Sequence, residues 1–379
     1  MDIRILLDEA QLEWVDGIWN RLCDKLAVTS VEACGKIPYT TINGIWNDAT
    51  ETGLLKGWIQ GFWPGLMWLM YVGTGEECYR KAATIVEERL DAALAIPTNL
   101  HHDVGFIWRI SSGVHYQLSH EERSRQRTYM AALALAGRFN PAGNFIRAFN
   151  QSGEEGKVII DTLMNLNLLY WASDEIGDPR FRNIAMCHAD RVMGTHLRPD
   201  GSVRQIVLFD PNTGEISGYE KGAANTLDGV WSRGQAWAVY GFVLSYLHTG
   251  KQDYLEASKK AAHYFIAEIA CNNWLPKVDF RAPSPSVDTT AGAITACGLL
   301  ELARVVSDGE KHLYLTAALK LLQALEVNYC NWTLEEQSIL QHGVESYTEE
   351  RLKGKPIIYG DYYFTEAIYK LKGFEPLFW

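Results

Sequence analysis

Two aspartates stand at the edges of apolar runs, where a carboxylate is costly to bury. Asp161 follows the apolar stretch 158–160 and precedes 163–166, which is apolar apart from one asparagine. Burial raises the pKa of a carboxyl group towards the value that a general acid needs. Asp103 directly precedes the apolar segment 104–108. Asp also favours helix N-caps and first turns, so helix capping stays open as an alternative for both residues.

The segment 228–241 concentrates aromatic, cationic and amide side chains. Trp231 and Trp237 flank Arg233 within seven residues. Indole rings suit stacking against a sugar ring, and a guanidinium group can hold a carboxylate with two parallel hydrogen bonds. The alternative is a tryptophan core in which Arg233 is paired internally. Trp58, which stands among glycine and polar neighbours, is a further candidate for a stacking surface.

Motifs for other chemistries are missing from the sequence. Histidine pairs at metal-binding spacing, a Gly-x-Ser-x-Gly elbow and a phosphate-binding Gly-rich loop are not found. The 7 cysteines are odd in number and include no Cys-x-x-Cys pair, which disfavours a disulfide framework and a cysteine zinc site. We therefore expect no metal, no cofactor and reduced thiols.

The charge balance narrows the range of partners. The chain of 379 residues has 35 Lys+Arg against 46 Asp+Glu, a formal charge of -11, and no basic run interrupts this acidic background. Binding to nucleic acid or to an anionic membrane surface is therefore disfavoured, and no obligate protein partner is inferred. No apolar run is long enough to span a membrane, and the first residues lack a signal-peptide pattern, so we expect cytoplasmic residence.

Apolar residues recur at helical spacing along most of the chain, which predicts a mainly α-helical protein. One phrase repeats: an apolar helix, a glycine turn, an aromatic residue about four positions later and a second amphipathic helix. Its copies lie at 71–79, 175–181, 247–254 and 307–314, and a fifth at 119–129 would use Ser or His in place of Gly.

This spacing predicts about six helical hairpins in the whole chain, and a ring of helix pairs closes without capping repeats. We therefore expect a double-layered α/α toroid whose loops form a mouth at one end. The β-forming segment 202–209 and the turn 210–214 would lie in the mouth as a short hairpin. Because no linker or shift in composition divides the sequence, we expect a single domain spanning 1–379.

Six phrases of the sequence, taken together and in order, resemble the unsaturated glucuronyl hydrolases of glycoside hydrolase family 88. The phrases extend over nearly the whole chain, so coincidence is improbable. The resemblance implies an all-α (α/α)6 barrel with short β-hairpins in the mouth loops, in agreement with the hairpin count. The phrases lie at 58–71, 101–106, 159–165, 231–237, 293–300 and 359–363.

The resemblance also implies an activity, the release of a 4,5-unsaturated uronic acid from the non-reducing end of oligosaccharides made by polysaccharide lyases. Asp161 matches the family's general acid and base, which protonates C4 and then helps water to add at C5. Asp103 matches the second essential carboxylate, which would orient Asp161 and tune its pKa. Hydration of the double bond differs from the two-carboxylate displacement of most glycosidases.

Substrate contacts carry over from the family to seven positions. The chain departs from the family at Gln205, near which several members have a histidine, and at Gly222-Ala223, where they have a His-Gln pair. The late loop has Arg351, Lys353 and Lys355 without the serines of members that favour sulfated sugars, so it is either a solvated basic loop or a contact to an acidic or sulfated sugar. The seven positions are Trp58, His102, Gln205, Trp231, Arg233, Trp237 and Tyr347.

Two alternatives remain. An unsaturated rhamnogalacturonyl hydrolase would share the toroid and act on pectin fragments, but it would be expected to show Gly-Asn-Gly-Trp at 234–237, where this chain has Gly-Gln-Ala-Trp. A carbohydrate-binding protein without catalysis is the second alternative, in which the aspartates would only cap helices.

Overall fold

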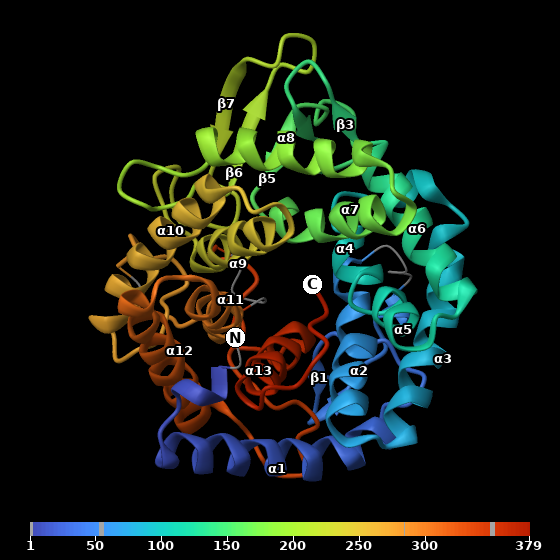
Figure 1. Cartoon of the computed structure of the whole chain (residues 1–379), viewed down its shortest axis with the longest axis vertical. Coiled ribbons are helices and arrows are strands. Elements are labelled where there is room, and N and C mark those ends of the chain that lie inside the picture. The colour runs from blue at the N-terminus through green and yellow to red at the C-terminus, as the bar shows by residue number, and fades with distance from the viewer. Residues whose placement is uncertain (1–2, 53–56, 284, 349–352) are drawn as a thin grey trace.

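The inner layer of the structure consists of helices that are buried along most of their length. The structure is a computed structural model that describes residues 3–52, 57–283, 285–348 and 353–379. Within the described residues, helices take six positions in the inner layer, and Figure 1 shows them around the middle of a ring. They are α2 (Phe62–Thr74), α4 (Val104–Trp108) followed by α5 (Ser112–Ser119), α7 (Thr162–Ile176), α9 (Ser232–Thr249), α11 (Thr289–Val305) and α13 (Ile358–Leu371).

The outer layer consists of helices with one buried and one exposed face, each adjacent in sequence to an inner helix. Helix α13 lies beside α2, which closes the inner ring, and α1 covers that closure from outside (Figure 1). The architecture is therefore the expected (α/α)6 barrel. The outer helices are α1 (Glu9–Glu32), α3 (Glu77–Leu94), α6 (Glu122–Ala136), α8 (Pro179–Thr195), α10 (Gln252–Ala270) and α12 (Asp308–Tyr329).

Left-handed residues end several inner helices, as the repeated phrase predicts. Gly75, Gly177 and Gly250 follow α2, α7 and α9 with φ angles of 77°, 68° and 69°, a region that glycine enters at little cost. His120 takes the same role after α5 with a φ angle of 58°. The predicted fifth hairpin is therefore present, with His in place of Gly.

The prediction of a glycine turn at 307–309 is wrong. Helix α11 ends at Val305, and Val306 after it is extended, with φ and ψ angles of -77° and 170°. Helix α12 already begins at Asp308, so Gly309 lies in its first turn. A glycine near a helix boundary was not sufficient to show on which side of the boundary it lies.

Short strands occupy the loops between helices. The predicted β-segment forms β6, which pairs with two neighbours in an antiparallel sheet of order β5-β6-β7 that projects from the ring (Figure 1). The strands are β1 (Thr41–Ile42), β2 (Ile45–Trp46), β3 (Phe139–Asn140), β4 (Phe145–Ile146), β5 (Lys157–Ile159), β6 (Ile206–Phe209) and β7 (Ile216–Glu220). Short 3-10 helices cover Ile3–Leu6, Ala49–Thr52, Trp58–Gly61 and Pro97–Asn99.

The inner helices start at the mouth of the barrel, so their positive dipole ends gather there. Close packing fixes two of these starts against each other, because a Cβ atom on Gly105 would lie 2.7 Å from the Asn165 Cα atom. Glycine thus lets α4 lie directly on α7. Among the described helices, none combines the length and the apolar character needed to cross a bilayer.

Candidate active site

Asp103 and Asp161 lie at the starts of the neighbouring inner helices α4 and α7. Both occupy the N-cap position, yet neither side chain accepts a hydrogen bond from its own helix. The capping alternative therefore fails for both residues. Neither carboxylate is used by its own helix, and the two residues lie near each other because the amide group of Asn165 donates to both of them.

Asp161 has the environment of a proton donor. Its side chain is half-buried, and its buried Oδ1 atom has no hydrogen-bond partner among the described residues. Burial, followed by the charge of Asp103, raises the pKa of Asp161 to about 8 against the opposing effect of Arg233. At neutral pH this carboxyl group is therefore largely protonated and able to donate a proton.

Asp103 is held in the ionised form by its neighbours. Burial acts to raise its pKa, but the nearby His102 and His101 and a hydrogen bond from Asn165 bring the pKa below its ordinary value. The Asp103 Oδ2 atom lies 3.3 Å from His102 Nε2 and 3.4 Å from His101 Nδ1. A charged acid therefore stands beside a protonated one, an arrangement that separates their acid and base roles.

Asn165 joins the two acids and was not singled out from the sequence. Its Nδ2 group donates to Asp103 Oδ1 at 3.0 Å and to the Asp161 backbone carbonyl at 3.1 Å. Its Oδ1 atom accepts from the Phe106 backbone N–H at 3.0 Å. The available signal was spacing, since a polar residue four positions after Asp161 lies on the same face of an otherwise apolar helix.

His102 supports Asp103 and is not itself an accessible contact for a substrate. The side chain is only 1% exposed, and its Nδ1 atom lies 2.7 Å from Thr162 Oγ1. Burial lowers the pKa of His102 to about 4, against the opposing effect of Asp103, so the ring is neutral at pH 7. The ring has almost no free surface, so the structure gives His102 a supporting contact to Asp103, and the substrate contact expected there stays a prediction.

The guanidinium group of Arg233 already forms hydrogen bonds within the protein. Nη1 donates to the Val344 carbonyl at 2.6 Å, Nη2 donates to the Glu345 carbonyl at 3.1 Å, and Asp288 Oδ2 lies 3.4 Å from Nη1. These bonds agree with the alternative in which Arg233 is paired within the protein. They do not agree with a guanidinium group that is free to form two hydrogen bonds to a substrate carboxylate. Arg233 instead fixes the late mouth loop and places a positive charge near Asp161.

The three candidate tryptophans differ in their access to solvent. Trp58 is half-buried and lies against Tyr359, with ring centroids 4.8 Å apart. Trp231 is 4% exposed and packs under Arg233, whose guanidinium carbon lies 4.5 Å from the ring centroid. Trp237 has 0% exposure, so the prediction that it stacks on a sugar does not fit this geometry. Of the three, Trp58 keeps the accessible ring surface.

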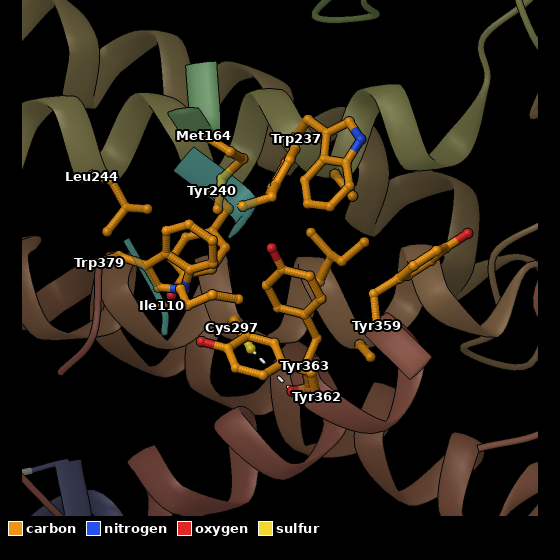
Figure 2. Packing of buried hydrophobic residues seen from close by; sticks show 14 of the residues in the cluster. Ile110, Met164, Trp237, Tyr240, Leu244, Cys297, Tyr359, Tyr362, Tyr363 and Trp379 are labelled. Carbon is orange, nitrogen blue, oxygen red and sulfur yellow. Dashed lines mark hydrogen bonds between the residues drawn. The ribbon is translucent and has the colours of Figure 1, made fainter. Parts of the chain in front are cut away.

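Trp237 belongs to an aromatic layer in the interior of the barrel. Its ring centroid lies 5.1 Å from that of Phe106 and 5.7 Å from that of Tyr363. Figure 2 shows Trp237 and Tyr363 close together among buried side chains of the inner helices. This layer supplies the apolar surroundings in which a carboxylate near α4 and α7 is costly to ionise.

Gln205 and Tyr347 meet at the loop that follows β7. The Ala223 backbone N–H donates to Gln205 Oε1 at 2.6 Å, and the Tyr347 N–H donates to the Ala223 carbonyl at 3.0 Å. The positions 205 and 222–223, at which the sequence departs from the family, are therefore in contact with each other. Gln205 holds this loop with its side-chain oxygen, and Tyr347 is half-buried beside it.

Two of the three basic residues of the late loop can be placed. The Lys353 ammonium lies 5.2 Å from the Tyr347 ring centroid, and Lys355 is exposed while its backbone pairs with Gly343. Arg351 lies outside the described residues. Lys353 therefore accompanies the ring at the mouth, whereas Lys355 has the setting of a solvated residue.

One group of side chains has the composition of a metal site. The ligand atoms of His101, His102 and Asp103 all lie within 4.8 Å of one another. The same atoms take part in the contacts that keep Asp103 ionised. The expectation that no metal is needed stays a prediction.

Comparison with known proteins identifies the family of the chain. The model of Glycosyl Hydrolase Family 88 matches residues 32–363. The chain belongs to glycosyl hydrolase family 88. This family 88 protein is 34% identical to the unsaturated glucuronyl hydrolase of Bacillus sp. (strain GL1), covering 86% of this chain and 88% of the relative. It is 32% identical to the unsaturated chondroitin disaccharide hydrolase of Streptococcus pyogenes serotype M1, covering 82% and 80%.

A solved structure supports the same conclusion for the fold. The crystal structure of the Bacillus sp. GL1 unsaturated glucuronyl hydrolase, described as responsible for the degradation of glycosaminoglycan, superposes with a TM-score of 0.85 at 32% identity. The match covers 93% of this chain and 96% of that one. The family 88 protein is therefore a glycoside hydrolase of the unsaturated glucuronyl hydrolase type, and the rhamnogalacturonyl alternative is disfavoured.

Proposed function

We propose that this family 88 enzyme hydrates the C4=C5 double bond of a terminal unsaturated uronic acid and so releases that sugar from an oligosaccharide. The observation that carries the proposal is the pairing of Asp161, whose pKa is raised to about 8, with an ionised Asp103 at the mouth of the barrel. A single carboxyl group that stays protonated at neutral pH suits the protonation of carbon in a vinyl ether.

The reaction begins with the transfer of the Asp161 proton to C4, which places positive charge on C5 and the ring oxygen. Water then adds at C5, and the Asp161 carboxylate takes one proton from it. The resulting hemiketal opens by breaking the bond between C5 and the ring oxygen, and the hemiacetal left at C1 expels the aglycone as an alcohol. Asp103 stabilises the developing cation by its negative charge and keeps Asp161 protonated beforehand.

Recognition of the substrate carboxylate rests on the surrounding positive potential. The starts of the inner helices and the charge of Arg233 face the site, and both favour an anionic ligand. This local field explains how a chain with a formal charge of -11 binds an acidic sugar, because distant surface charges are screened. Trp58 supplies the stacking surface for the ring, and Tyr347 lies at the rim.

Glycosaminoglycans are the proposed source of the oligosaccharides. The names of the relatives support this class, since one is an unsaturated chondroitin disaccharide hydrolase and the other is an unsaturated glucuronyl hydrolase. Such fragments bear an unsaturated uronic acid after cleavage by a polysaccharide lyase. The lyase that supplies them therefore acts before this enzyme.

We also propose that the enzyme works in the cytoplasm as one catalytic domain over residues 1–379. The support for this compartment is the set of seven free cysteines, since none of them forms a disulfide. The continuous ring of inner helices supports the single domain. Cell fractionation with an antibody to the protein tests the compartment, and recovery in a secreted fraction would contradict it.

The direct test is the loss of the ultraviolet absorbance of the double bond. We expect this loss with unsaturated disaccharides from chondroitin or heparin-type chains and not with pectin-derived ones. Asp161→Asn should slow it by about 10²–10⁴-fold, the usual contribution of a general acid. Asp178→Asn is the matched control, because Asp178 is a genuine N-cap whose side chain accepts from the Arg180 N–H. Equal activity of the two variants, or no turnover of any disaccharide, would contradict the proposal.

A further inference from the structure

The last described segment, 374–379, folds back into the end of the barrel that lies opposite the mouth. It follows the C-terminal end of α13, whose start lies at the mouth, and Figure 1 shows the end of the chain in the middle of the ring. Trp379 is only 7% exposed, and Tyr369 donates a hydrogen bond from its hydroxyl to the Pro376 carbonyl at 2.9 Å. The segment is thus anchored in the barrel and not free in solvent.

Trp379 contacts rings from three inner helices. It stacks on Tyr363 of α13 with a centroid distance of 6.2 Å and an angle of 5° between the rings. It meets Phe106 of α4 edge-on, at 6.0 Å and 87°, and Tyr240 of α9 at 6.2 Å and 72°. Figure 2 shows Trp379 in the same cluster as Tyr240 and Tyr363. One side chain therefore touches three of the helices that surround the lumen.

A buried polar network fixes the orientation of the indole. The Trp379 Nε1 group donates to Glu366 Oε2 at 3.1 Å, while the Tyr240 hydroxyl donates to the other oxygen of Glu366. Lys370 lies 3.1 Å from Glu366 and 2.5 Å from Glu301, so both carboxylates have a cationic partner. Because Glu366 cannot turn away without breaking these contacts, the indole ring has one favoured position.

Two of the residues whose rings contact Trp379 connect it to the two acids. Phe106 donates its backbone N–H to Asn165 Oδ1 at 3.0 Å, and the amide of Asn165 in turn bonds Asp103 and the Asp161 backbone. Tyr363 lies near enough to Asp161 for the aspartate to act on the titration of its hydroxyl. Trp379 therefore contacts Phe106, whose backbone bonds the amide that holds the Asp103 carboxylate, and Tyr363, which lies near Asp161.

We propose that Trp379 is a positioning residue of the active site, which holds Phe106 and Tyr363 beneath the two acids and keeps water away from them. This inference rests on the proposed role of Asp161 as the general acid. A hollow of about 100 Å³ lies against Trp379, lined also by Leu247 and Lys370. Removal of the indole would extend this hollow towards Phe106 and Tyr363, which Trp379 now contacts, and let water approach the acids.

The charges that face Asp161 set the expected direction of the change. They come from Asp103 on α4 and Arg233 on α9, and burial has the largest effect of all, whereas the nearby Tyr363 hydroxyl on α13 is neutral because burial raises its pKa well above the ordinary value. Water below the aromatic layer reduces the cost of ionising Asp161. The pKa of Asp161 should therefore fall in Trp379→Ala, whereas a purely structural role of the indole would leave it unchanged.

The matched control is Phe378→Ala, which removes a buried ring from the same segment. Phe378 is 2% exposed and packs on Tyr369, with ring centroids 5.9 Å apart. Tyr369 takes no part in the contacts that connect Trp379 to the two acids. Both variants should lose a similar amount of thermal stability. Only Trp379→Ala should lower kcat, by about tenfold or more, since small displacements of acid-base groups are costly.

The primary measurement is a carbon NMR titration of the Asp161 carboxyl group in the protein without substrate. We expect a pKa lower by about one unit in Trp379→Ala and unchanged in Phe378→Ala. Added indole should restore both kcat and the pKa, because engineered apolar cavities bind small aromatic molecules. If Trp379→Ala does not fold, Trp379→Leu leaves a smaller space and should give a shift in the same direction.

The outcomes separate this inference from the proposed function. A lower stability with an unchanged pKa and unchanged kcat in both Trp379 variants would overturn the positioning role. Activity of the wild-type enzyme on the disaccharides tests the proposed function independently. If the wild-type protein turned over none of them while the pKa of Asp161 still fell in Trp379→Ala, the proposed function would fail and the structural link would stand.

Discussion

The side-chain amide of Asn165 donates a hydrogen bond to Asp103 and thereby ties the start of α4 to the start of α7. The bond measures 3.0 Å, and the same amide group also reaches the Asp161 backbone carbonyl at 3.1 Å. A donor to a carboxylate favours its ionised form. Asn165 therefore helps to keep Asp103 charged and, through that charge, Asp161 protonated.

Asn165→Ala should reduce kcat by about 10–100-fold, because the ionisation of Asp103 and the alignment of the two helices both depend on the amide. It also removes one of the two acceptors of the buried Phe106 N–H, which keeps its bond to the Asp103 carbonyl at 3.2 Å, and this loss costs about 1 kcal/mol of stability. Steady-state kinetics and denaturant unfolding measure the two effects.

The control for this variant is Asn167→Ala on the same helix. Asn167 is 1% exposed, and its amide donates only to the Met164 carbonyl, at 2.7 Å, among the hydrogen bonds of the described chain. A similar loss of stability with nearly unchanged kcat is expected there. Equal kcat values for the two variants would remove Asn165 from the site.

The pH profile of kcat/KM should be bell-shaped. Activity needs Asp161 protonated and Asp103 ionised, so it should fall as the pH rises through about 8, the pKa of Asp161. On the acid side it should fall as Asp103 takes up a proton, below the ordinary pKa of a carboxyl group. The two limbs belong to the coupled pair of acids and not to either residue alone.

The variant Asp103→Asn tests whether the charge of Asp103 raises the pKa of Asp161. Removal of the negative charge beside Asp161 makes ionisation of Asp161 easier, so the alkaline limb of the residual activity should move to lower pH. Buffers that overlap between pH 5 and 10 are needed for the measurement. A limb that moved to higher pH would show that Asp103 does not act on Asp161 through its charge.

Much of the fold could be predicted from the sequence because it depends on periodic apolar spacing and on short-range turn chemistry. Gly75, Gly177 and Gly250 each end an inner helix through a backbone conformation that favours glycine. Gly309 broke the pattern, because the extended Val306 separates α11 from α12 without a glycine. Local rules therefore found the number of helix pairs more reliably than their boundaries.

The chemistry of the site could be predicted only in part. Asp161 was recognisable because a carboxylate among apolar residues is costly, and its raised pKa agrees with that reasoning. The sequence could not show that Arg233 donates its hydrogen bonds to backbone carbonyls more than one hundred positions away, nor that Trp237 is fully buried. Both outcomes depend on long-range packing, which leaves no trace in local spacing.

Protonation of Asp161 in the folded state should make stability depend on pH. The unfolded chain ionises this group near its ordinary pKa, whereas the folded protein holds the proton up to about pH 8. Between these values the folded state binds more protons, so this group makes stability fall as the pH rises, by on the order of 1 kcal/mol per pH unit at most.

Asp161→Asn removes that dependence. Thermal unfolding should show the variant to be more stable than the wild type at pH 7.5, with a difference that shrinks towards pH 5. Asp178→Asn, which changes an exposed cap, should not gain stability in this way. An Asp161→Asn protein that was less stable than the wild type at every pH would show that the carboxylate is ionised and favourably paired.

Trp58 and Trp237 should respond in opposite ways to truncation, which tests their different access to solvent. Trp58 is half-buried at the mouth, so Trp58→Ala should raise KM by about tenfold, in line with the ~1–3 kcal/mol found for stacking of aromatic side chains on planar ligands, and leave unfolding nearly unchanged. Trp237 is fully buried, so Trp237→Ala should cost about 3–5 kcal/mol of stability.

Trp237→Phe separates packing from direct contact with the sugar. Phenylalanine keeps an aromatic ring between Phe106 and Tyr363 and removes the smaller part of the indole, including an N–H that has no hydrogen-bond partner among the described residues. We therefore expect a smaller loss of stability than in Trp237→Ala and a KM within about twofold of the wild type for Trp237→Phe. A rise in KM as large as that of Trp58→Ala, without a loss of stability, would mean that the bound sugar reaches Trp237 and that the aromatic layer opens when the substrate binds.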